Sequence, residues 1–201
     1  MTRFLLIRHA TTDAVGKRLS GRTPGVALNN EGQAQAQRLA QQLTSLPLDA
    51  LYSSPLERAV QTAEPIAKAK GLETIICEAV LEMDFGQWTN RTFKELESDS
   101  QFQHFNTFRS NTRIPGGELM LEAQARMVRG LEKLGAQHPN QTVAVVSHAD
   151  LIKAAVAYYA GIHLDMFQRL EISAASVSIV EVYEETARIL LINHTGEIKL
   201  W

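Results

Sequence analysis

The sequence FLLIRH at Phe4–His9 places an arginine and a histidine directly after a short apolar run. A short continuous apolar run that ends in polar residues is typical of a buried strand. In open parallel sheets, ligands bind outside the carboxyl ends of the strands. The stretch therefore predicts a buried strand with Arg8 and His9 at its functional end.

The same order of an apolar run and then a charged or imidazole side chain occurs twice more. Residues 50–52 lead to Arg58, and residues 143–146 lead to Ser147 and His148. Arginine bonds phosphate oxygens in bidentate fashion and stays charged at every physiological pH. The three strand ends together predict a site that binds a phosphate group.

The composition is that of one globular domain. The chain has 201 residues, of which 45% are hydrophobic and 21% charged. Its net charge of −2 gives no general attraction for nucleic acid or an anionic membrane, and we expect neither as a partner. Cys77 is the only cysteine, which excludes an internal disulfide, and its apolar neighbours predict a buried strand thiol. No apolar run has the length of a membrane span or a signal-peptide core, so we expect a cytoplasmic protein.

Predicted strands and helices alternate along most of the chain. Asn30 and Ser54 are the expected N-caps of the first two helices. The order predicts a three-layer α/β sandwich whose sheet is mainly parallel, with an antiparallel edge strand from a terminal hairpin. We expect strands at 3–7, 50–53, 74–78, 142–147, 176–183 and 188–193, and helices at 30–44, 55–70, 118–137 and 149–160.

A polar and aromatic stretch at 90–117 interrupts this order. We expect one domain over residues 1–201, with residues 90–117 as a cap-like insertion. A homodimer in which two subunits pair through the edge strand of the hairpin is an open alternative. The cap residues that we expect to sort substrates are Phe102, His104, Phe105, Arg109 and Arg113.

His9 can serve a phosphate site in two ways, as a cation that binds the phosphate or as a nucleophile that takes the phosphoryl group. The positive charges of Arg8 and Arg58 disfavour imidazole protonation and so favour the neutral, attacking form. A phosphohistidine would divide ester hydrolysis into two easier steps. His148 would then neutralise charge on the transferring group.

The leaving alcohol also needs a proton, and the segment LEMDFGQW at 81–88 offers two carboxyl groups. Glu82 is the first candidate, because apolar and aromatic neighbours raise the pKa of a carboxyl toward neutrality. Asp84 is the rival acid. The basic, glycine-punctuated loop at 16–22 is expected to close over the anion or over the rest of the substrate.

Four stretches resemble the histidine phosphatase superfamily, the phosphoglycerate-mutase-like clan, and the resemblance spans nearly the whole chain. Residues 6–12 (LIRHATT) resemble its nucleophile motif, and residues 53–63 (SSPLERAVQTA) resemble its second-arginine motif. Residues 81–88 resemble its acid-bearing segment, and residues 146–149 (VSHA) resemble its second-histidine motif.

The resemblance implies a phosphoglycerate-mutase-like fold and catalysis without a metal or an organic cofactor. It implies His9 as the nucleophile, Glu82 as the proton donor, and Arg8, Arg58 and His148 as the phosphate pocket. The further residues that we expect at the substrate are Thr12, Ser20, Gly21, Arg22 and Ala149.

Several positions depart from the family pattern. Ala10 and Ala149 stand where glycines are usual, Thr11 where a glutamate is frequent, and Asn90 where a glycine is common. Val15 stands where many members have an asparagine that binds phosphate, which weakens the case for a mutase.

These features predict a metal-independent phosphatase that hydrolyses a small phosphorylated metabolite through a phosphohistidine. Three alternatives remain open: a phosphoglycerate-mutase-like phosphomutase, a phosphatase acting on phosphohistidine in proteins, and a non-catalytic module that binds a phosphorylated ligand. A metal hydrolase is disfavoured, because neither a His-Glu-x-x-His motif nor paired cysteines occur. The sequence does not choose between sugar phosphates, nucleotides and a ribazole-phosphate-like ester.

Overall fold

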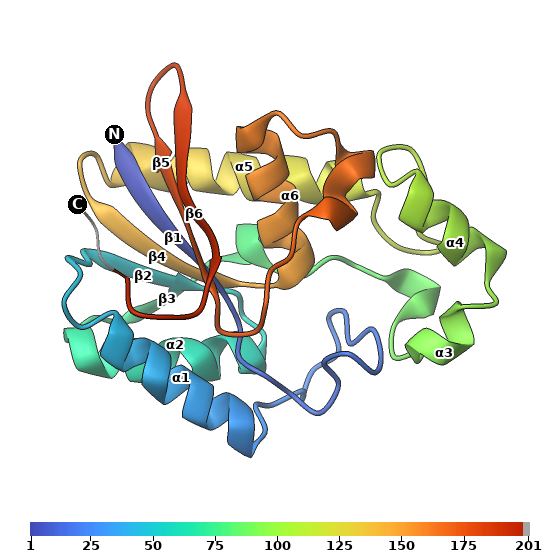
Figure 1. The fold of residues 1–201 in the computed structure, drawn as a ribbon, viewed down its shortest axis with the longest axis horizontal. Coiled ribbons are helices and arrows are strands. Elements are labelled where there is room, and N and C mark those ends of the chain that lie inside the picture. Colours follow the sequence, from blue (N-terminus) through green and yellow to red (C-terminus); the bar gives the residue numbers. More distant parts are fainter. Residues whose placement is uncertain (199–201) are drawn as a thin grey trace.

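A six-stranded sheet forms the middle layer of the structure, a computed structural model that describes residues 1–198 (Figure 1). The strand order is β3-β2-β4-β1-β5-β6. The strands are β1 (Thr2–Arg8), β2 (Ala50–Ser53), β3 (Thr74–Ile76), β4 (Thr142–Ser147), β5 (Val177–Val182) and β6 (Ala187–His194). The first four strands pair in parallel, whereas β5 pairs antiparallel with both β1 and β6. The expected mainly parallel sheet with an antiparallel hairpin at one edge is confirmed.

Two pairs of helices cover the two faces of this sheet (Figure 1). Helices α1 (Asn30–Gln42) and α2 (Glu57–Lys70) lie on one face, and α5 (Met120–Gln137) and α6 (Ala149–Ala160) lie on the other. Side chains of β1 alternate between the layers, as the two-residue period of a strand requires. Leu5 belongs to the core with α1 and α2, and Leu6 belongs to the core with α5 and α6. The expected three-layer sandwich is confirmed.

The stretch after β3 contains short helical segments in place of a long element. They are the 3₁₀ turns η1 (Glu78–Val80) and η2 (Gly86–Trp88) and the helices α3 (Phe93–Leu96) and α4 (Ser100–Thr107). A further 3₁₀ segment, η3 (Leu164–Arg169), follows α6. Helices α3 and α4 lie beyond the carboxyl ends of the parallel strands (Figure 1). The buried Trp88 ring contacts Phe102 and Phe105 of α4 at centroid distances of 5.2 and 5.3 Å, which fixes α4 to the core.

The sequence predicted the wrong residue as the N-cap of both α1 and α2. Asn29, and not Asn30, caps α1: its side-chain oxygen accepts a hydrogen bond from the Gly32 amide at 2.9 Å. The N-cap of α2 is Leu56, without a side-chain cap. Ser54 is unavailable as a helix cap because its hydroxyl bonds the His148 imidazole at 2.8 Å.

The third strand is shorter and more exposed than expected. It ends at Ile76, and β3 lies at the edge of the sheet. Ile75 and Ile76 are 45% and 49% exposed, and Cys77 is half-buried, so the expectation of a buried thiol is wrong. An edge strand has no neighbouring strand on one side, and here the helices leave the side chains of Ile75 and Ile76 exposed. Within residues 1–198, no helix is long and apolar enough to cross a membrane.

Candidate active site

Neighbouring strands bring the predicted site residues together at one end of the sheet. Arg8 is the last residue of β1, and His9 follows it. Ser147 ends β4 in register with Arg8, so that His148 lies beside His9 with 5.2 Å between the ring centroids. Arg58 enters from the first turn of α2, directly after β2. The strand-end pattern in the sequence therefore corresponds to one cluster in space.

Arg58 lies at the centre of this cluster and is only 2% exposed. Its Nε donates to Nε2 of His9 at 3.3 Å, and its Nη2 donates to the Gly21 carbonyl at 2.8 Å. The same Nη2 lies 3.3 Å from Nδ1 of His148. Arg58 thus ties together the strand ends and the loop at 16–22.

Two buried guanidinium nitrogens of this cluster, Nη1 of Arg58 and Nε of Arg8, have no hydrogen-bond partner among the described residues. Three further ones lie outside the cluster, two on Arg109 and one on Arg126. The other end of Arg8 is fixed, because its Nη1 donates to the Ile172 carbonyl at 2.6 Å. Buried charged donors without partners are costly. Two of them in one cluster are suited to an anion with several oxygens.

The surroundings of His9 fix its tautomer. Its Nδ1 lies 2.8 Å from the Ala10 carbonyl, which only accepts, so Nδ1 carries the hydrogen. Its Nε2 is the unprotonated nitrogen, and its lone pair accepts from Arg58. Burial first, and then the charges of Arg58 and Arg8, lower the pKa of His9 to about 3 against the opposing hydrogen bond to Ala10. His9 is therefore neutral at physiological pH, with Nε2 as a nucleophile.

Glu82 lies on the other side of His148. Its Oε2 is 3.7 Å from Nδ1 of His148, and its Oε1 accepts from the Met83 amide at 2.9 Å. Burial first, and then the negative charge of Asp150, raise the pKa of Glu82 to about 7 against the opposing charge of Arg58. A carboxyl with this pKa can hold a proton at neutral pH and release it during a reaction.

Asp84, the rival acid, has a different environment. Its Oδ1 accepts from the Gly86 amide at 2.9 Å, and its Oδ2 lies 3.8 Å from Arg22. It does not line the cavity beside His9, whereas Glu82 does. The geometry therefore favours Glu82 as the acid.

His148 is fully buried behind this cavity. Its Nδ1 accepts from Arg58, so Nε2 carries the hydrogen and donates to Ser54 Oγ at 2.8 Å. Burial holds the pKa of His148 well below its ordinary value, and the neighbouring His9 and Arg58 lower it further. In this structure His148 is a neutral ring that supports Arg58.

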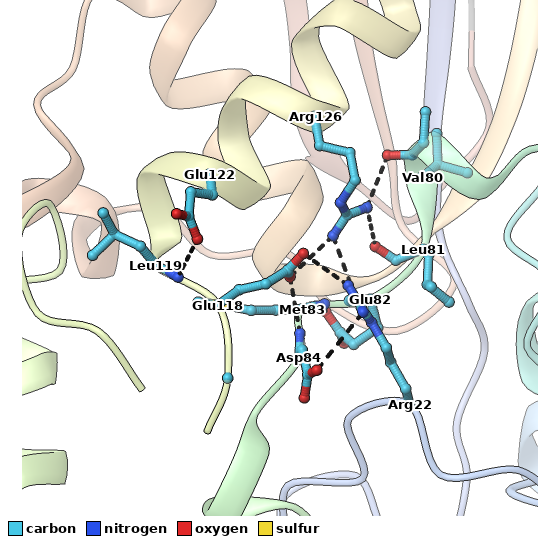
Figure 2. Close-up of polar contacts among 12 residues, drawn as sticks. Arg22, Val80, Leu81, Glu82, Met83, Asp84, Glu118, Leu119, Glu122 and Arg126 are labelled. Atoms are coloured by element: carbon cyan, nitrogen blue, oxygen red, sulfur yellow. Dashed lines mark hydrogen bonds and ion pairs between the residues drawn. The ribbon is translucent and has the colours of Figure 1, made fainter. Parts of the chain in front are cut away.

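The cavity at the strand ends has a volume of about 140 Å³. Arg8, His9, Arg58 and Glu82 line it. The expected substrate contacts that also line it are Thr12, Ser20, Gly21 and Ala149. Arg22 does not, because its guanidinium turns toward the backbone of the Glu82 segment (Figure 2).

The sequence analysis did not predict two kinds of residue that line the cavity. Asp150 lines the cavity, as do the aromatic side chains of Phe85 and Phe93. Asp150 comes two residues after His148, and that proximity was the one available signal. Arg18, from the basic loop, lines the cavity as well.

The expected cap residues do not line this cavity. Arg109 is buried between the rings of Phe105 and Phe167, with its guanidinium carbon 4.4 and 4.6 Å from the ring centroids. Its Nη1 lies 3.8 Å from Asp150. Arg113 pairs with the exposed Glu122. The cap thus reaches the cavity directly through Phe93 and indirectly through Arg109 and Asp150.

A larger cavity of about 740 Å³ lies between α5, α6 and the turn of the β5–β6 hairpin. Tyr158, Tyr159 and three glutamates help to line it, and no arginine, lysine or histidine does. Such a lining is unsuited to a phosphate group. In the described part of the chain, no group of three or more His, Cys, Asp or Glu side chains is arranged to hold a metal ion.

Comparisons with known proteins agree with this geometry. Phosphoserine phosphatase 1 of Hydrogenobacter thermophilus is 33% identical over 204 residues, covering 98% of this chain and 96% of that protein. A phosphoserine phosphatase mutant from Entamoeba histolytica, solved in complex with phosphoserine, has a TM-score of 0.88 at 28% identity and covers 99% of this chain and 100% of its own. Bacillus stearothermophilus YhfR gives a TM-score of 0.91 at 26% identity, with 99% and 100% covered. The family model described as "Histidine phosphatase superfamily (branch 1)" matches residues 4–195, and the chain belongs to this superfamily.

Proposed function

We propose that this protein is a phosphatase that hydrolyses a small phosphomonoester through a phosphohistidine at His9. One observation carries the proposal. The Ala10 carbonyl at Nδ1 and Arg58 at Nε2 orient the His9 ring so that its unprotonated Nε2 lies beside two buried guanidinium nitrogens that lack partners. This arrangement supports a nucleophile next to a binding site for a dianion.

In the first step, His9 Nε2 attacks phosphorus, and a P–N bond forms as the P–O ester bond breaks. The proton of Glu82 goes to the oxygen of the leaving alcohol. Arg8 and Arg58 stabilise the negative charge on the transferring group. Each guanidinium contributes on the order of 4 kcal/mol of gross Coulomb energy at close contact, before desolvation is subtracted.

In the second step, water attacks the phosphohistidine, and the P–N bond breaks. The Glu82 carboxylate takes the proton of that water, which restores the acid for the next cycle. Inorganic phosphate leaves, and His9 returns to its neutral form. One carboxyl with a pKa of about 7 is suited to both proton transfers.

The cavity supports a small substrate whose alcohol carries an ammonium group, of which phosphoserine is the example named for two of the relatives. A volume of about 140 Å³ has room for a phosphate and a few further atoms. Asp150 places a negative charge in the wall, opposite in sign to the arginines that would hold the phosphate. Arg109 holds that carboxylate from the cap side at 3.8 Å.

The test compares phosphoserine with the phosphate ester of 3-hydroxypropanoate, which is the same molecule without the ammonium group. We expect phosphate release from both, with phosphoserine preferred. Asp150→Asn should reduce this preference about tenfold, since a hydrogen bond to a charged group contributes roughly 1.5–3 kcal/mol. Asp13→Asn, at an exposed loop residue outside the cavity wall, is the matched control and should leave the ratio unchanged. An unchanged ratio in Asp150→Asn would contradict this substrate class, and transfer of phosphate within a retained substrate would indicate a mutase.

Three expectations about the chain as a whole stay predictions. We propose one domain over residues 1–201, in which residues 90–117 act as the cap. Support for the cap comes from the contact of Arg109 with Asp150. A cytoplasmic location and a homodimer through the hairpin edge complete the proposal.

A further inference from the structure

The sequence predicted that Arg22 contacts the substrate, but in the structure its side chain contacts other residues. Its Nε donates to the Glu82 carbonyl at 2.8 Å, and its Nη2 lies 2.9 Å from Glu118 Oε1 (Figure 2). Its Nη1 approaches Asp84 at 3.8 Å. Arg22 therefore contacts the segment that carries the proposed acid and does not line the cavity.

Glu118 joins this arginine to a second one. Its Oε2 accepts from Arg126 Nη2 at 3.2 Å and from the Asp84 amide at 3.0 Å (Figure 2). Arg126, from α5, donates through Nη1 to the carbonyls of Ala79 and Leu81 at 3.0 and 2.7 Å. Two guanidinium groups and one carboxylate thus hold the main chain around Glu82.

The main chain at 81–84 depends on these side chains. It lies between η1 and η2, outside every helix and strand. Its polar groups therefore receive no bonds from a regular ladder and need partners elsewhere. Arg22, Glu118 and Arg126 supply those partners, and none of the three lines the cavity. The position of the Glu82 carboxyl follows from this main chain, and so does its bond with the Met83 amide at 2.9 Å.

The loop that carries Arg22 also contacts the phosphate side of the site. Gly21 accepts from Arg58 Nη2 at 2.8 Å, and Arg22, the next residue, donates to the Glu82 carbonyl. Two consecutive residues therefore connect the expected phosphate-binding arginine with the expected acid. A loop that is out of place would disturb the acid even if the nucleophile stayed intact.

We propose that Arg22, Glu118 and Arg126 are positioning residues that hold Glu82 where it can protonate the leaving alcohol. The inference rests on the proposed function of Glu82. Arg22 would contact no substrate, so its loss should affect only the two proton transfers of Glu82, to the leaving alcohol and from the attacking water. The ion pair of Arg22 with Glu118 is partly exposed and should add little to stability by itself.

The experiment uses two substrates that differ in their need for an acid. The alcohol of phosphoserine is a poor leaving group and needs a proton, whereas 2,4-dinitrophenolate leaves without one. We expect Arg22→Met and Glu118→Gln to lower kcat for phosphoserine about 10- to 100-fold, the range expected when a catalytic group is displaced by about 1 Å. These losses are compared as kcat/KM as well, which reports only the steps up to loss of the alcohol and omits the later hydrolysis in which Glu82 acts as a base. With 2,4-dinitrophenyl phosphate, kcat/KM should change less than about twofold.

Matched controls come from the pair Arg38 and Glu31 on α1, also 2.9 Å apart and exposed. Arg38→Met and Glu31→Gln should leave both substrates unaffected. Circular dichroism and thermal unfolding of each variant establish that it is folded. Equal losses on both substrates, or no loss on either, would overturn the inference, because a substrate contact or a general structural defect lowers both rates.

A double-mutant cycle separates this inference from the proposed function. If the inference holds, Arg22→Met should have no further effect on phosphoserine turnover in a Glu82→Gln background, since the group that it positions is already gone. Additive losses would overturn the inference while leaving the phosphatase activity established. If Glu82→Gln itself spares phosphoserine turnover, Glu82 is not the acid and the inference falls with that role. Absence of phosphate release from wild-type protein with every substrate would contradict the proposed function itself.

Discussion

His9 and Glu82 occupy similar depths in the protein, and burial shifts their pKa values in opposite directions. Burial favours the neutral form of each, which lowers the pKa of the imidazole to about 3 and raises that of the carboxyl to about 7. The consequence is a histidine that can attack and a carboxyl that can donate, both at neutral pH. Neither property belongs to the residue type alone.

The raised pKa of Glu82 predicts a pH-dependent cost in stability. In the folded state this carboxyl binds its proton more tightly than in the unfolded chain, so its contribution is fully present below pH 4.5 and is lost as pH rises through about 7. Glu82→Gln removes the charge and should gain stability relative to wild type over this range, by up to about 3 kcal/mol at pH 8. Urea unfolding at pH 4.5 and pH 8 measures the difference. A gain that is equal at both pH values would contradict the burial of this charge.

At the scale of elements, the site depends on how closely α1 packs against the chain that follows β1. Gly32 in α1 lies so near that a Cβ built on it would be 2.0 Å from the Thr11 carbonyl oxygen. Main-chain atoms cannot move aside as a flexible side chain can. The glycine therefore lets the helix approach the loop that continues from His9.

Gly32→Ala should therefore destabilise the protein, although alanine is the better helix former. We expect a loss of about 1–3 kcal/mol, the range for an overpacked site, together with weaker phosphatase activity as the loop after His9 shifts. Urea unfolding and phosphate release measure the two effects. Gln37→Ala, at an exposed position of the same helix, should stay within about 0.5 kcal/mol of wild type. Equal stability of Gly32→Ala and wild type would show that the contact is easily relaxed.

The sequence was most informative where structure is local. Apolar runs predicted the order of strands and helices along the chain, and the strand-end residues Arg8, His9 and His148 came together because parallel strands end at one edge. The sequence could not predict which side chains at the sheet edge are buried, because the exposure of Cys77 depends on which strand has no neighbour.

At the scale of the whole molecule, contacts between distant segments decide the rest. Arg22 stands next to Gly21 in a basic loop, and nothing in that loop indicates its bond with the Glu82 carbonyl sixty residues away. Asp150 likewise becomes a wall residue only because α6 starts at the mouth of the cavity. The sheet and the nucleophile were therefore predictable, and the surroundings of the acid were not.

The proposed reaction requires that three separate parts of the chain deliver their residues to one phosphorus atom. His9 follows β1, Arg58 comes from α2, and Glu82 comes from the segment between β3 and α5. A covalent intermediate on His9 is the chemical event that this convergence predicts.

The most direct test of this claim is to trap the phosphoenzyme. Wild-type protein is mixed with ³²P-labelled phosphoserine, quenched in alkaline detergent, and digested for peptide mapping. We predict label that is stable in alkali and labile in acid, located on the peptide that contains His9, with no label and no phosphate release in His9→Ala. Label that persists on His9→Ala, or phosphate release that the substitution leaves undiminished, would contradict the account.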